Sequence, residues 1–372
     1  MNSIGNETEM TSSNNYVSEE VVIKIGAKTF PKNTIVFPKV GAAVYTNKKR
    51  ILVTDSLIDN NLMGVTSNSE DICSPNFLLF YFLTLDLKDI SNPGPLPSIN
   101  AQRVKSLKIP LPPLPEQHAI ATTLRTVQEA QEKTDDVIAA TKALKAAMMK
   151  HLFTYGPVPL EEAERVALKE TEIGPVPEDW EVAKFSDVVD IAKGQIDPTT
   201  EPYSKLLHIG PENIISGTGQ VIRMRTAEEI NLISGQFYFT SEHVIYSKIR
   251  PYLKKVAFPK IEGTCSADMY PLKPQDARLF SEFLFQYLLS DQFSNSAISF
   301  QDRTGIPKIN RQQIGMIHLP IPPLTIQKQI ATILSSIDQK LAAELSRREA
   351  LNTLFASLLH DLMTAKIQVS TV

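Results

Sequence analysis

Two stretches of this 372-residue sequence concentrate side chains that can contact phosphate. Positions 21–50 hold seven basic residues and no acidic one, and positions 221–260 hold seven basic residues against three glutamates. A local basic face is enough for contact with a nucleic-acid backbone, although the net charge of the whole chain is −3. A solvated lysine-rich surface explains either stretch alone, but two stretches at related positions favour nucleic-acid contact.

The candidates for DNA contact are ranked by their place in these stretches. Arginine can donate two hydrogen bonds to O6 and N7 of guanine, whereas lysine more often holds a phosphate. The first group follows a predicted strand and comprises Lys248, Arg250, Lys254 and Lys255. The second group surrounds a glycine turn before a proline-rich motif and comprises Gln301, Arg303 and Lys308. The remaining candidates are Arg223 and Arg225 and, lower in rank, Lys39, Lys48, Lys49 and Arg50.

No motif of an enzyme that modifies or cuts DNA is visible in the sequence. It lacks an Asn/Asp-Pro-Pro-Tyr/Phe motif for a flipped base, a glycine-rich strand–helix turn for S-adenosylmethionine and a Gly-x-x-x-x-Gly-Lys loop for ATP. It also lacks the Glu-x-Lys half of a nuclease motif. The six histidines are scattered, without the spacing of metal ligands. We therefore expect a non-catalytic chain with no cofactor or metal of its own.

A long-period repeat organises the chain. The segment from Pro97 to Leu124 matches the segment 210 positions later, and 13 of its 28 positions are identical. Chance would give roughly two identities at ordinary residue frequencies. The matches include a Pro-x-Ile-Asn motif, a Pro-x-Pro-Pro-Leu turn, and a Gln followed by Ile-Ala-Thr. This pattern indicates an internal duplication.

Each proline-rich turn precedes a long stretch without proline or glycine, in which apolar residues recur every three or four positions. This spacing predicts helices over about 116–153 and 326–366, each roughly 55–60 Å long at 1.5 Å per residue. Because a globular segment lies between them, we expect the two helices to pair in antiparallel fashion, with room for a partner helix. The expected spacer or partner positions are Ile120, Leu124, Ile138, Ile330, Leu334, Leu341, Leu351 and Leu358. Polar residues at 134, 141, 344 and 348 interrupt the seam, and Met148, Met149 and Met363 are expected to fill its core.

The segments between the predicted helices are of mixed α/β character. Short β-like runs are predicted at 180–185, 188–191, 237–239 and 243–246, and a buried helix at 280–289. The first half repeats part of this, with a strand at 34–37 and a helix at 77–83. It lacks about 30 residues at its start, including any counterpart of the strand after Trp180. Either this copy begins differently by nature, or the chain is a shortened version of a longer ancestor.

The two cysteines, Cys73 and Cys265, lie far apart, which favours a reducing compartment over a disulfide or zinc framework. No apolar run is long enough for a membrane span, and the polar start does not resemble a signal peptide. We expect a cytoplasmic protein with no membrane partner.

The run Thr-Glu-Ile-Gly-Pro-Val-Pro-Glu-Asp-Trp-Glu-Val at 171–182, with the twice-used proline turn and its Gln and Ile-Ala-Thr, resembles the DNA-specificity (S) subunit of type I restriction–modification enzymes. The resemblance covers about 34–366. It implies an α+β fold in which two target-recognition domains are joined by two long antiparallel helices, which form a coiled-coil-like spacer with pseudo-two-fold symmetry. It places the first recognition domain at 1–109, its proline turn and helix at 110–156, a linker at 157–178, the second recognition domain at 179–318, and its turn and helix at 319–372.

The resemblance further implies that each domain reads one half of a split site in double-stranded DNA, while the helices set the gap and dock two methyltransferase subunits. Restriction subunits would join the full complex, and S-adenosylmethionine, ATP and Mg²⁺ would belong to these partners. Two readings compete with this one. The first is a shortened scaffold that binds the methyltransferase but reads one half-site or none. The second is a free-standing methyltransferase, which the missing motifs disfavour.

Overall fold

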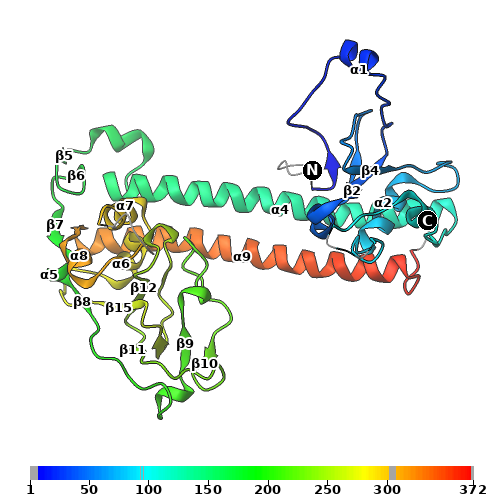
Figure 1. Cartoon of the computed structure of the whole chain (residues 1–372). Helices are drawn as coiled ribbons and strands as arrows, with labels where there is room; N and C mark the ends of the chain where they lie inside the picture. The colour runs from blue at the N-terminus through cyan, green and yellow to red at the C-terminus, as the bar shows by residue number, and fades with distance from the viewer. Residues whose placement is uncertain (1–6, 93, 95, 301–306, 370–372) are drawn as a thin grey trace. The chain divides into compact units, whose positions relative to one another are not determined.

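The computed structural model describes residues 7–92, 94, 96–300 and 307–369. The chain divides into two compact units. Unit 1 comprises residues 1–135 and 347–372, and unit 2 comprises residues 136–346. Each unit therefore contains one globular part and portions of both long helices, α4 (Leu114–Tyr155) and α9 (Leu324–Met363) (Figure 1).

The globular part of unit 1 is a small sheet with helices. Its strands are β1 (Glu9–Met10), β2 (Ile35–Pro38), β3 (Arg50–Leu52) and β4 (Leu62–Val65). Its helices are α1 (Glu19–Ile25), η1 (Gly41–Thr46), α2 (Pro75–Thr84) and α3 (Ala101–Lys105). The strand order is β1-β3-β2-β4. The apolar helix α2 and strand β2 share one core with the first turns of α4 and the last turns of α9.

Unit 2 contains more elements. Its helices are η2 (Leu160–Arg165), α5 (Phe185–Val188), η3 (Tyr203–Lys205), η4 (Pro211–Asn213), η5 (Pro251–Leu253), α6 (Ser281–Leu288), α7 (Asp291–Ser299) and α8 (Arg311–Met316). Its strands are β5 (Leu168–Lys169), β6 (Val176–Pro177), β7 (Glu181–Lys184), β8 (Val189–Ile191), β9 (Leu207–Ile209), β10 (Arg225–Thr226), β11 (Phe237–Phe239), β12 (Val244–Ser247), β13 (Val256–Ala257), β14 (Gly263–Cys265), β15 (Met269–Pro274) and β16 (His318–Ile321).

The strands of unit 2 form two four-stranded sheets and two short pairs. The orders are β13-β12-β15-β8 and β10-β9-β14-β11, and the pairs are β16-β7 and β5-β6. The first sheet packs with α6 and with Trp180 into the larger core, which also includes residues of α4 and α9. The segment predicted as a linker carries the β5–β6 pair, and Val176 within it is fully buried.

The sequence-based expectations for the elements are largely confirmed. The strands predicted at 34–37, 237–239 and 243–246 are β2, β11 and β12, and the two predicted buried helices are α2 and α6. The run predicted at 188–191 is a strand only from Val189, because Val188 completes the helical turn α5. The two long helices begin and end within three residues of the predicted bounds.

Local sequence explains the ends of these elements. In the repeated Pro-x-Ile-Asn motif, the asparagine caps a short helix: Asn100 Oδ1 accepts a hydrogen bond from the Arg103 amide, and Asn310 Oδ1 accepts one from the Gln313 amide. Helix α4 ends where Gly156 adopts a φ of 81°, a left-handed conformation that glycine adopts without steric cost. In the described part of the chain, no helix is long and apolar enough to cross a membrane.

Within each unit the portions of α4 and α9 run antiparallel, as expected. The residue numbers of the partners on α9 decrease as those on α4 increase. In unit 1, Gln131 Nε2 donates to Asn352 Oδ1 at 3.0 Å, and Asp135 pairs with Arg348 at 2.7 Å. In unit 2 Lys145 pairs with Asp338 at 2.5 Å, and both side chains are largely buried. The expected core methionines 149 and 363 are buried, and Met148 packs partly against the core of unit 2.

The predicted seam residues lie mostly inside. Ile120, Leu124 and Ile138 on α4 are buried, as are Ile330, Leu334 and Leu341 on α9, whereas Leu351 and Leu358 are half-buried. The polar positions Thr134 and Thr141 are also buried. The Thr134 hydroxyl donates to the Ala130 carbonyl of its own helix, which satisfies it inside the seam.

Candidate nucleic-acid interface

A sharp corner after strand β12 brings Lys248 and Arg250 of the first group together with Lys308 of the second. The Ile309 amide donates to the Lys248 carbonyl at 2.9 Å, and the Arg250 amide donates to the Pro307 carbonyl at 2.7 Å. Ile249 and Lys308 form an antiparallel bridge between these hydrogen bonds. Two segments about 60 positions apart in sequence are thus joined by backbone hydrogen bonds. We call them the corner of unit 2 (residues 248–250 and 307–309). Gln301 and Arg303 lie outside the described residues.

Arg250 occupies a costly backbone conformation at this corner. Its φ and ψ are 48° and 60°, in the left-handed region, which costs a non-glycine residue about 1–2 kcal/mol. The side chain is exposed and, among the described residues, makes no hydrogen bond or ion pair. The buried Pro251 follows and fixes the backbone beyond it. The fold therefore presents a guanidinium that stabilises nothing in the described protein.

The other basic residues of the first group contact the protein itself. Lys248 Nζ donates to the Ala267 carbonyl at 2.7 Å, Lys254 pairs with Asp291 at 2.5 Å, and Lys255 Nζ donates to the Pro211 carbonyl at 2.5 Å. These three are half-buried and help to shape the loop around the corner. Lys308 is exposed at the corner itself. Arg250 and Lys308 are therefore its best-presented charges.

The candidates Arg223 and Arg225 lie on a different part of unit 2. Both are exposed, Arg225 at the start of β10. With His208 and Glu212 they line a hollow of about 560 Å³. Burial lowers the pKa of His208 below its usual value, so the neutral imidazole is favoured there.

Unit 1 contains the same corner with different side chains. The Ile99 amide donates to the Lys39 carbonyl at 2.8 Å, the Gly41 amide donates to the Pro97 carbonyl at 2.8 Å, and Val40 bridges Ser98. Gly41, with a φ of 74°, therefore takes the place of Arg250. Ser98 takes the place of Lys308, and Lys39 corresponds to Lys248.

This correspondence was missed from the sequence alone. Residues 39–41 lie 209 positions before their counterparts 248–250, whereas residues 97–99 lie 210 positions before their counterparts 307–309. An alignment of the two halves at one fixed offset therefore cannot match both parts of the corner. The signal was present in the repeated Pro-x-Ile-Asn motif, which supplies the second half of the corner in both units.

Two of the predicted contact residues in unit 1 are buried, which argues against their contact with DNA. Lys49 is 3% exposed, and its Nζ donates to Asn47 Oδ1 at 2.8 Å and to the Leu85 carbonyl at 2.5 Å. Burial lowers the pKa of Lys49 to about 8, so this group loses its proton more readily than an exposed lysine does. Arg50 lies in strand β3 and is 5% exposed. Lys48 and Lys39 are half-buried.

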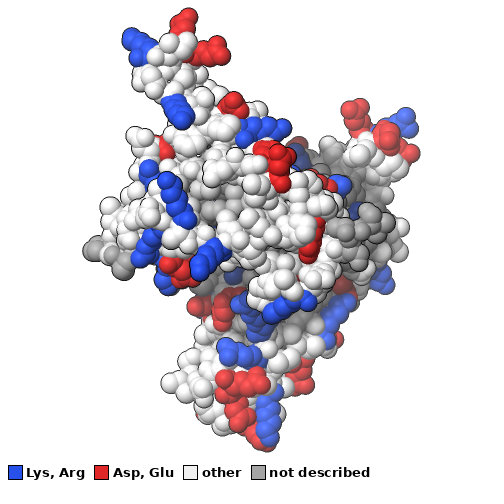
Figure 2. Space-filling view, turned by 90° about the vertical axis from the view of Figure 1, so that its right-hand side faces the viewer, with Lys and Arg blue, Asp and Glu red and all other residues white. Residues whose placement is uncertain are grey.

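Basic and acidic side chains lie in small groups on the face that Figure 2 shows. On the face in Figure 2, Lys and Arg side chains are interspersed with Asp and Glu. This face therefore has no broad positive potential that could hold DNA by itself. Local features such as the corner carry more weight than the total charge.

A buried glutamine attaches each globular part to its long helix. In unit 2, Gln327 Oε1 accepts from the Phe280 amide at 2.8 Å, and its Nε2 donates to the carbonyls of Arg278 and Pro322 at 2.6 and 2.7 Å. In unit 1, Gln117 makes the same three bonds, each at 2.9 Å, to the Ser74 amide and the carbonyls of Ile72 and Pro112. We call this arrangement the glutamine joint.

The joints have a positional role that the sequence did not reveal. Gln117 and Gln327 are 1% and 0% exposed. Each joins the residue before a buried helix (α2 or α6) to the first turn of α4 or α9. Their identity across the repeat was the only visible signal. The joint fixes each globular part, and so each corner, on its own helix.

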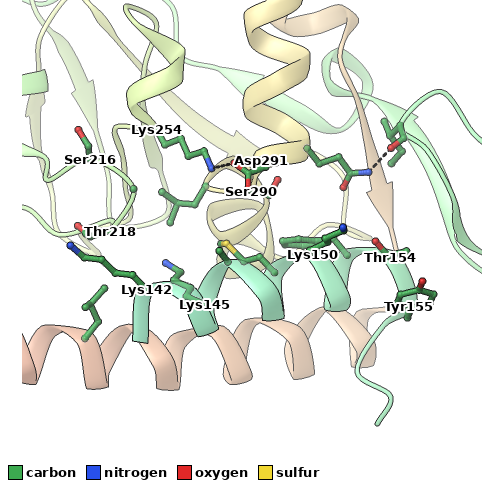
Figure 3. Close-up of a pocket in the computed structure, with 18 of the residues that line it drawn as sticks. Lys142, Lys145, Lys150, Thr154, Tyr155, Ser216, Thr218, Lys254, Ser290 and Asp291 are labelled. Carbon is green, nitrogen blue, oxygen red and sulfur yellow. Dashed lines mark hydrogen bonds and ion pairs between the residues drawn. The ribbon is translucent and has the colours of Figure 1, made fainter. Parts of the chain in front are cut away.

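A cavity of about 690 Å³ lies in unit 2 beside the second half of α4 (Figure 3). Met149, Phe153 and Leu289 give it an apolar lining, and Lys142, Lys145 and Lys150 come from α4. On the opposite side the ion pair of Lys254 and Asp291 lies near its wall. The described residues contain no group of three His, Cys, Asp or Glu that could hold a metal ion.

Comparison with known proteins gives this arrangement a family. The model of the type I restriction modification DNA specificity domain matches residues 4–139 and 177–353. The specificity subunit of the type I restriction enzyme EcoDI of Escherichia coli is 30% identical over 282 residues, which cover 70% of this chain and 62% of that protein. The MjaVIII specificity subunit of Methanocaldococcus jannaschii is 29% identical over 308 residues, or 79% of this chain and 71% of that protein.

Solved structures show a similar fold. The S subunit of a type I restriction–modification system from M. genitalium superposes with a TM-score of 0.60 at 16% identity, over 90% of this chain and 84% of the other. A chain from a structural study of type I complex assembly gives a TM-score of 0.52 at 19% identity. The match to this chain spans less than two thirds of the EcoDI subunit. The family model covers most of the length of this chain. With its duplicated corner and helix, the chain belongs to the type I restriction–modification DNA specificity family.

Proposed function

We propose that this chain is the sequence-specific DNA-recognition subunit of a type I restriction–modification complex. The observation that carries the proposal is that the corner occurs in both units with the same backbone hydrogen bonds but with different side chains. A constant frame with variable side chains is what two readers of different half-sites require. Arg250 at the second corner is suited to the O6 and N7 atoms of a guanine, and Lys308 to a phosphate.

In this proposal the paired helices hold the two readers and set the gap between the half-sites. The glutamine joints support this role, because they fasten each globular part to a helix by three hydrogen bonds without side-chain freedom. The buried pair of Lys145 and Asp338 also supports it. In the repeat, Lys145 corresponds to Phe355 and Asp338 to Gln128. The ion pair therefore forms only in unit 2, and it favours one antiparallel register of the two helices.

The proposed partners are two methyltransferase subunits and, in the complete enzyme, restriction subunits. Leu144 on α4 and Leu354 on α9 are equivalent positions of the repeat, and they are 51% and 46% exposed. Exposed apolar side chains at equivalent sites suit two identical partners, one for each helix. Methyl transfer and cleavage, with S-adenosylmethionine, ATP and Mg²⁺, would then be carried out by these subunits, and this chain would be non-catalytic.

Replacing Leu144 and Leu354 by aspartate is expected to prevent binding of the methyltransferase without unfolding the chain. Each exposed side chain contributes apolar area to the proposed contact, and a carboxylate there is costly to bury. Co-purification and analytical ultracentrifugation measure the stoichiometry. Each single variant should lose one partner and the double variant both. The matched control is Ile233→Asp, at an exposed isoleucine between β10 and β11, and loss of binding in that control would contradict the assignment.

The test of the proposed function is co-purification with the methyltransferase, followed by methylome sequencing of DNA modified by the complex. A split, adenine-methylated motif is the expected result. A stable complex that leaves no motif, or one that yields only half of a motif, would contradict the two-reader proposal. S-adenosylmethionine bound to the isolated chain would contradict its non-catalytic role.

A further inference from the structure

The hollow of unit 2 beside strands β9 and β10 (Figure 1) contains charges that are not neutralised within the described protein. Its lining residues are His208, Glu212, Asn213, Ile222, Arg223, Arg225 and Ile230. In the described ranges, the side chains of Arg223, Arg225 and Glu212 make no hydrogen bond or ion pair. Two guanidinium groups and a carboxylate thus share this hollow, which we call the arginine hollow, without pairing with each other.

The backbone of Arg223 resembles that of Arg250. Its φ of 53° lies in the left-handed region, which costs a non-glycine residue about 1–2 kcal/mol. Among the described residues, Lys254 and Lys260 also lie in this region, but each forms an ion pair with an acidic side chain. The fold therefore bears the same cost at both arginines, although neither side chain stabilises the described protein.

The side chain of Asn213 holds the loop that presents Arg223. Its Nδ2 donates to the carbonyls of Ile222 and Arg223 at 3.1 and 3.2 Å. Its Oδ1 accepts a hydrogen bond from the Gly210 amide at 2.9 Å. Because one side chain joins both walls of the arginine hollow, the position of Arg223 is fixed before any ligand binds.

Gly210 leaves the space that the carboxylate of Glu212 occupies. A Cβ atom at position 210 would overlap the carboxylate atoms of Glu212. The backbone of Gly210 is extended, with a φ of −100° and a ψ of 172°, so its conformation does not require glycine. Burial favours the neutral imidazole of His208, whose Nδ1 lies 3.2 Å from Thr264 Oγ1, so this group does not neutralise the carboxylate.

Two contacts fasten the arginine hollow to the segment that follows the corner. Lys255 Nζ donates to the Pro211 carbonyl at the start of η4, and the Gly217 amide donates to the Lys254 carbonyl at 3.2 Å. The five positions from Arg250 to Lys255 span at most roughly 18 Å, which is about five base-pair steps of DNA. The hollow and the corner can therefore contact the same half-site.

The mixture of charges in the hollow selects the ligand. A phosphate suits two arginines, but the carboxylate of Glu212 repels it. In the major groove a G·C pair presents two adjacent acceptors, N7 and O6 of guanine, and then a donor, N4 of cytosine. An arginine can donate to both acceptors, and a glutamate can accept from the donor. In an A·T pair the N6 donor of adenine lies between the acceptors, so one guanidinium does not find two of them side by side.

Resting on the DNA recognition proposed above, we propose that the arginine hollow reads one G·C base pair, at a position of the half-site other than that read by the corner. Arg223 donates to O6 and N7 of guanine, and Glu212 accepts from N4 of cytosine. Arg225, in the edge strand β10, holds a neighbouring phosphate. Gly210 and Asn213 are positioning residues. Glu212 is thus a specificity-determining residue that a preference for basic side chains would pass over.

The test measures the selectivity of the assembled complex at each base pair of its methylated motif. Competition binding uses duplexes in which each position of the half-site carries each of the other base pairs in turn. Arg223→Gly should relax the choice at one G·C position by about ten- to a hundredfold. Glu212→Gln should relax the same position, because an amide donates as well as accepts. Arg225→Gln should weaken binding to all duplexes alike.

Gly210→Ala keeps every charged side chain and changes only the place of one. The extended backbone accepts alanine, and the added methyl group displaces only the flexible end of Glu212. The melting temperature should therefore stay within about 2 °C of the native value, while the choice relaxes at the same position as in Glu212→Gln. Glu178→Gln, at an exposed glutamate that does not line the hollow, is the matched control and should change nothing.

The corner variant Arg250→Gly separates this inference from the proposed function. If it relaxes one position while Arg223→Gly and Glu212→Gln relax none, the corner reads DNA and the arginine hollow does not. The inference is also overturned if the two hollow variants relax different positions or an A·T position, or if both weaken all duplexes alike. A complex that leaves no motif and binds every duplex equally would overturn the inference together with the proposed function.

Discussion

Replacing Arg250 by glycine is expected to lower the affinity of the assembled complex for its DNA site by about ten- to a hundredfold. The guanidinium is exposed at the corner and has no hydrogen-bond partner among the described residues, so its removal leaves no group of the described protein unsatisfied. One bidentate contact between arginine and guanine accounts for about 1–3 kcal/mol of discrimination. The same complex should methylate its sites more slowly and with relaxed choice at one base pair.

The stability of the variant should remain unchanged or rise slightly. Arg250 has a φ of 48°, and glycine adopts such a conformation without the steric cost that arginine bears. Unit 1 shows that the corner accepts glycine, because Gly41 stands at the equivalent position with the same backbone hydrogen bond. Alanine would weaken binding as well, but it would retain the steric cost, so glycine separates recognition from folding more cleanly.

Lys260→Gly is the matched control for this variant. Lys260 is also an exposed basic residue in the left-handed region, with a φ of 54°, but it pairs with Glu282 away from the corner. Fluorescence anisotropy with the methylated motif and calorimetric unfolding are measured for both variants. If Arg250→Gly methylates the same sites at the same rate as the native chain, or if Lys260→Gly loses as much affinity, the corner is not the reader.

The parts of the fold that depend on local pattern could be predicted from the sequence. The recurrence of apolar residues every three or four positions gave α4 and α9, and the proline turns marked their starts. The antiparallel pairing followed from the globular segment between the helices. These features depend on residues close in sequence or on the repeat itself.

The site depends on tertiary contacts that the sequence does not display. Lys254 and Lys255 looked equivalent to Arg250, but Asp291 and the Pro211 carbonyl hold them to the protein. Lys49 and Arg50 looked exposed within a basic run, but both are buried where β3 joins the sheet. Charge in a sequence window shows where contact is chemically feasible, whereas the packing decides which side chains are free to make it.

Replacing Gln327 by leucine is expected to lower the free energy of unfolding of unit 2 by about 3 kcal/mol. Leucine fills a similar volume but leaves the Phe280 amide and two carbonyls without their buried partner, and each such group costs about 1–3 kcal/mol. Gln117→Leu should weaken unit 1 by a similar amount, since its three bonds are the same. Because two units unfold, hydrogen exchange of individual amides is a better measure than one global transition.

Gln329→Leu makes the same chemical change two positions along α9, where the glutamine is exposed, and should have little effect. In Gln327→Leu the Phe280 amide should exchange at least tenfold faster, and the first turn of α6 should loosen from α9. Gln327→Glu retains an acceptor for this amide, so it should restore its protection in part while the two carbonyls remain unpaired. If Gln327→Leu and Gln329→Leu exchange alike, the joint does not hold the domain on its helix. If the joint loosens but the methylated motif keeps its gap and both halves, the spacing of the site is set elsewhere in the helix pair.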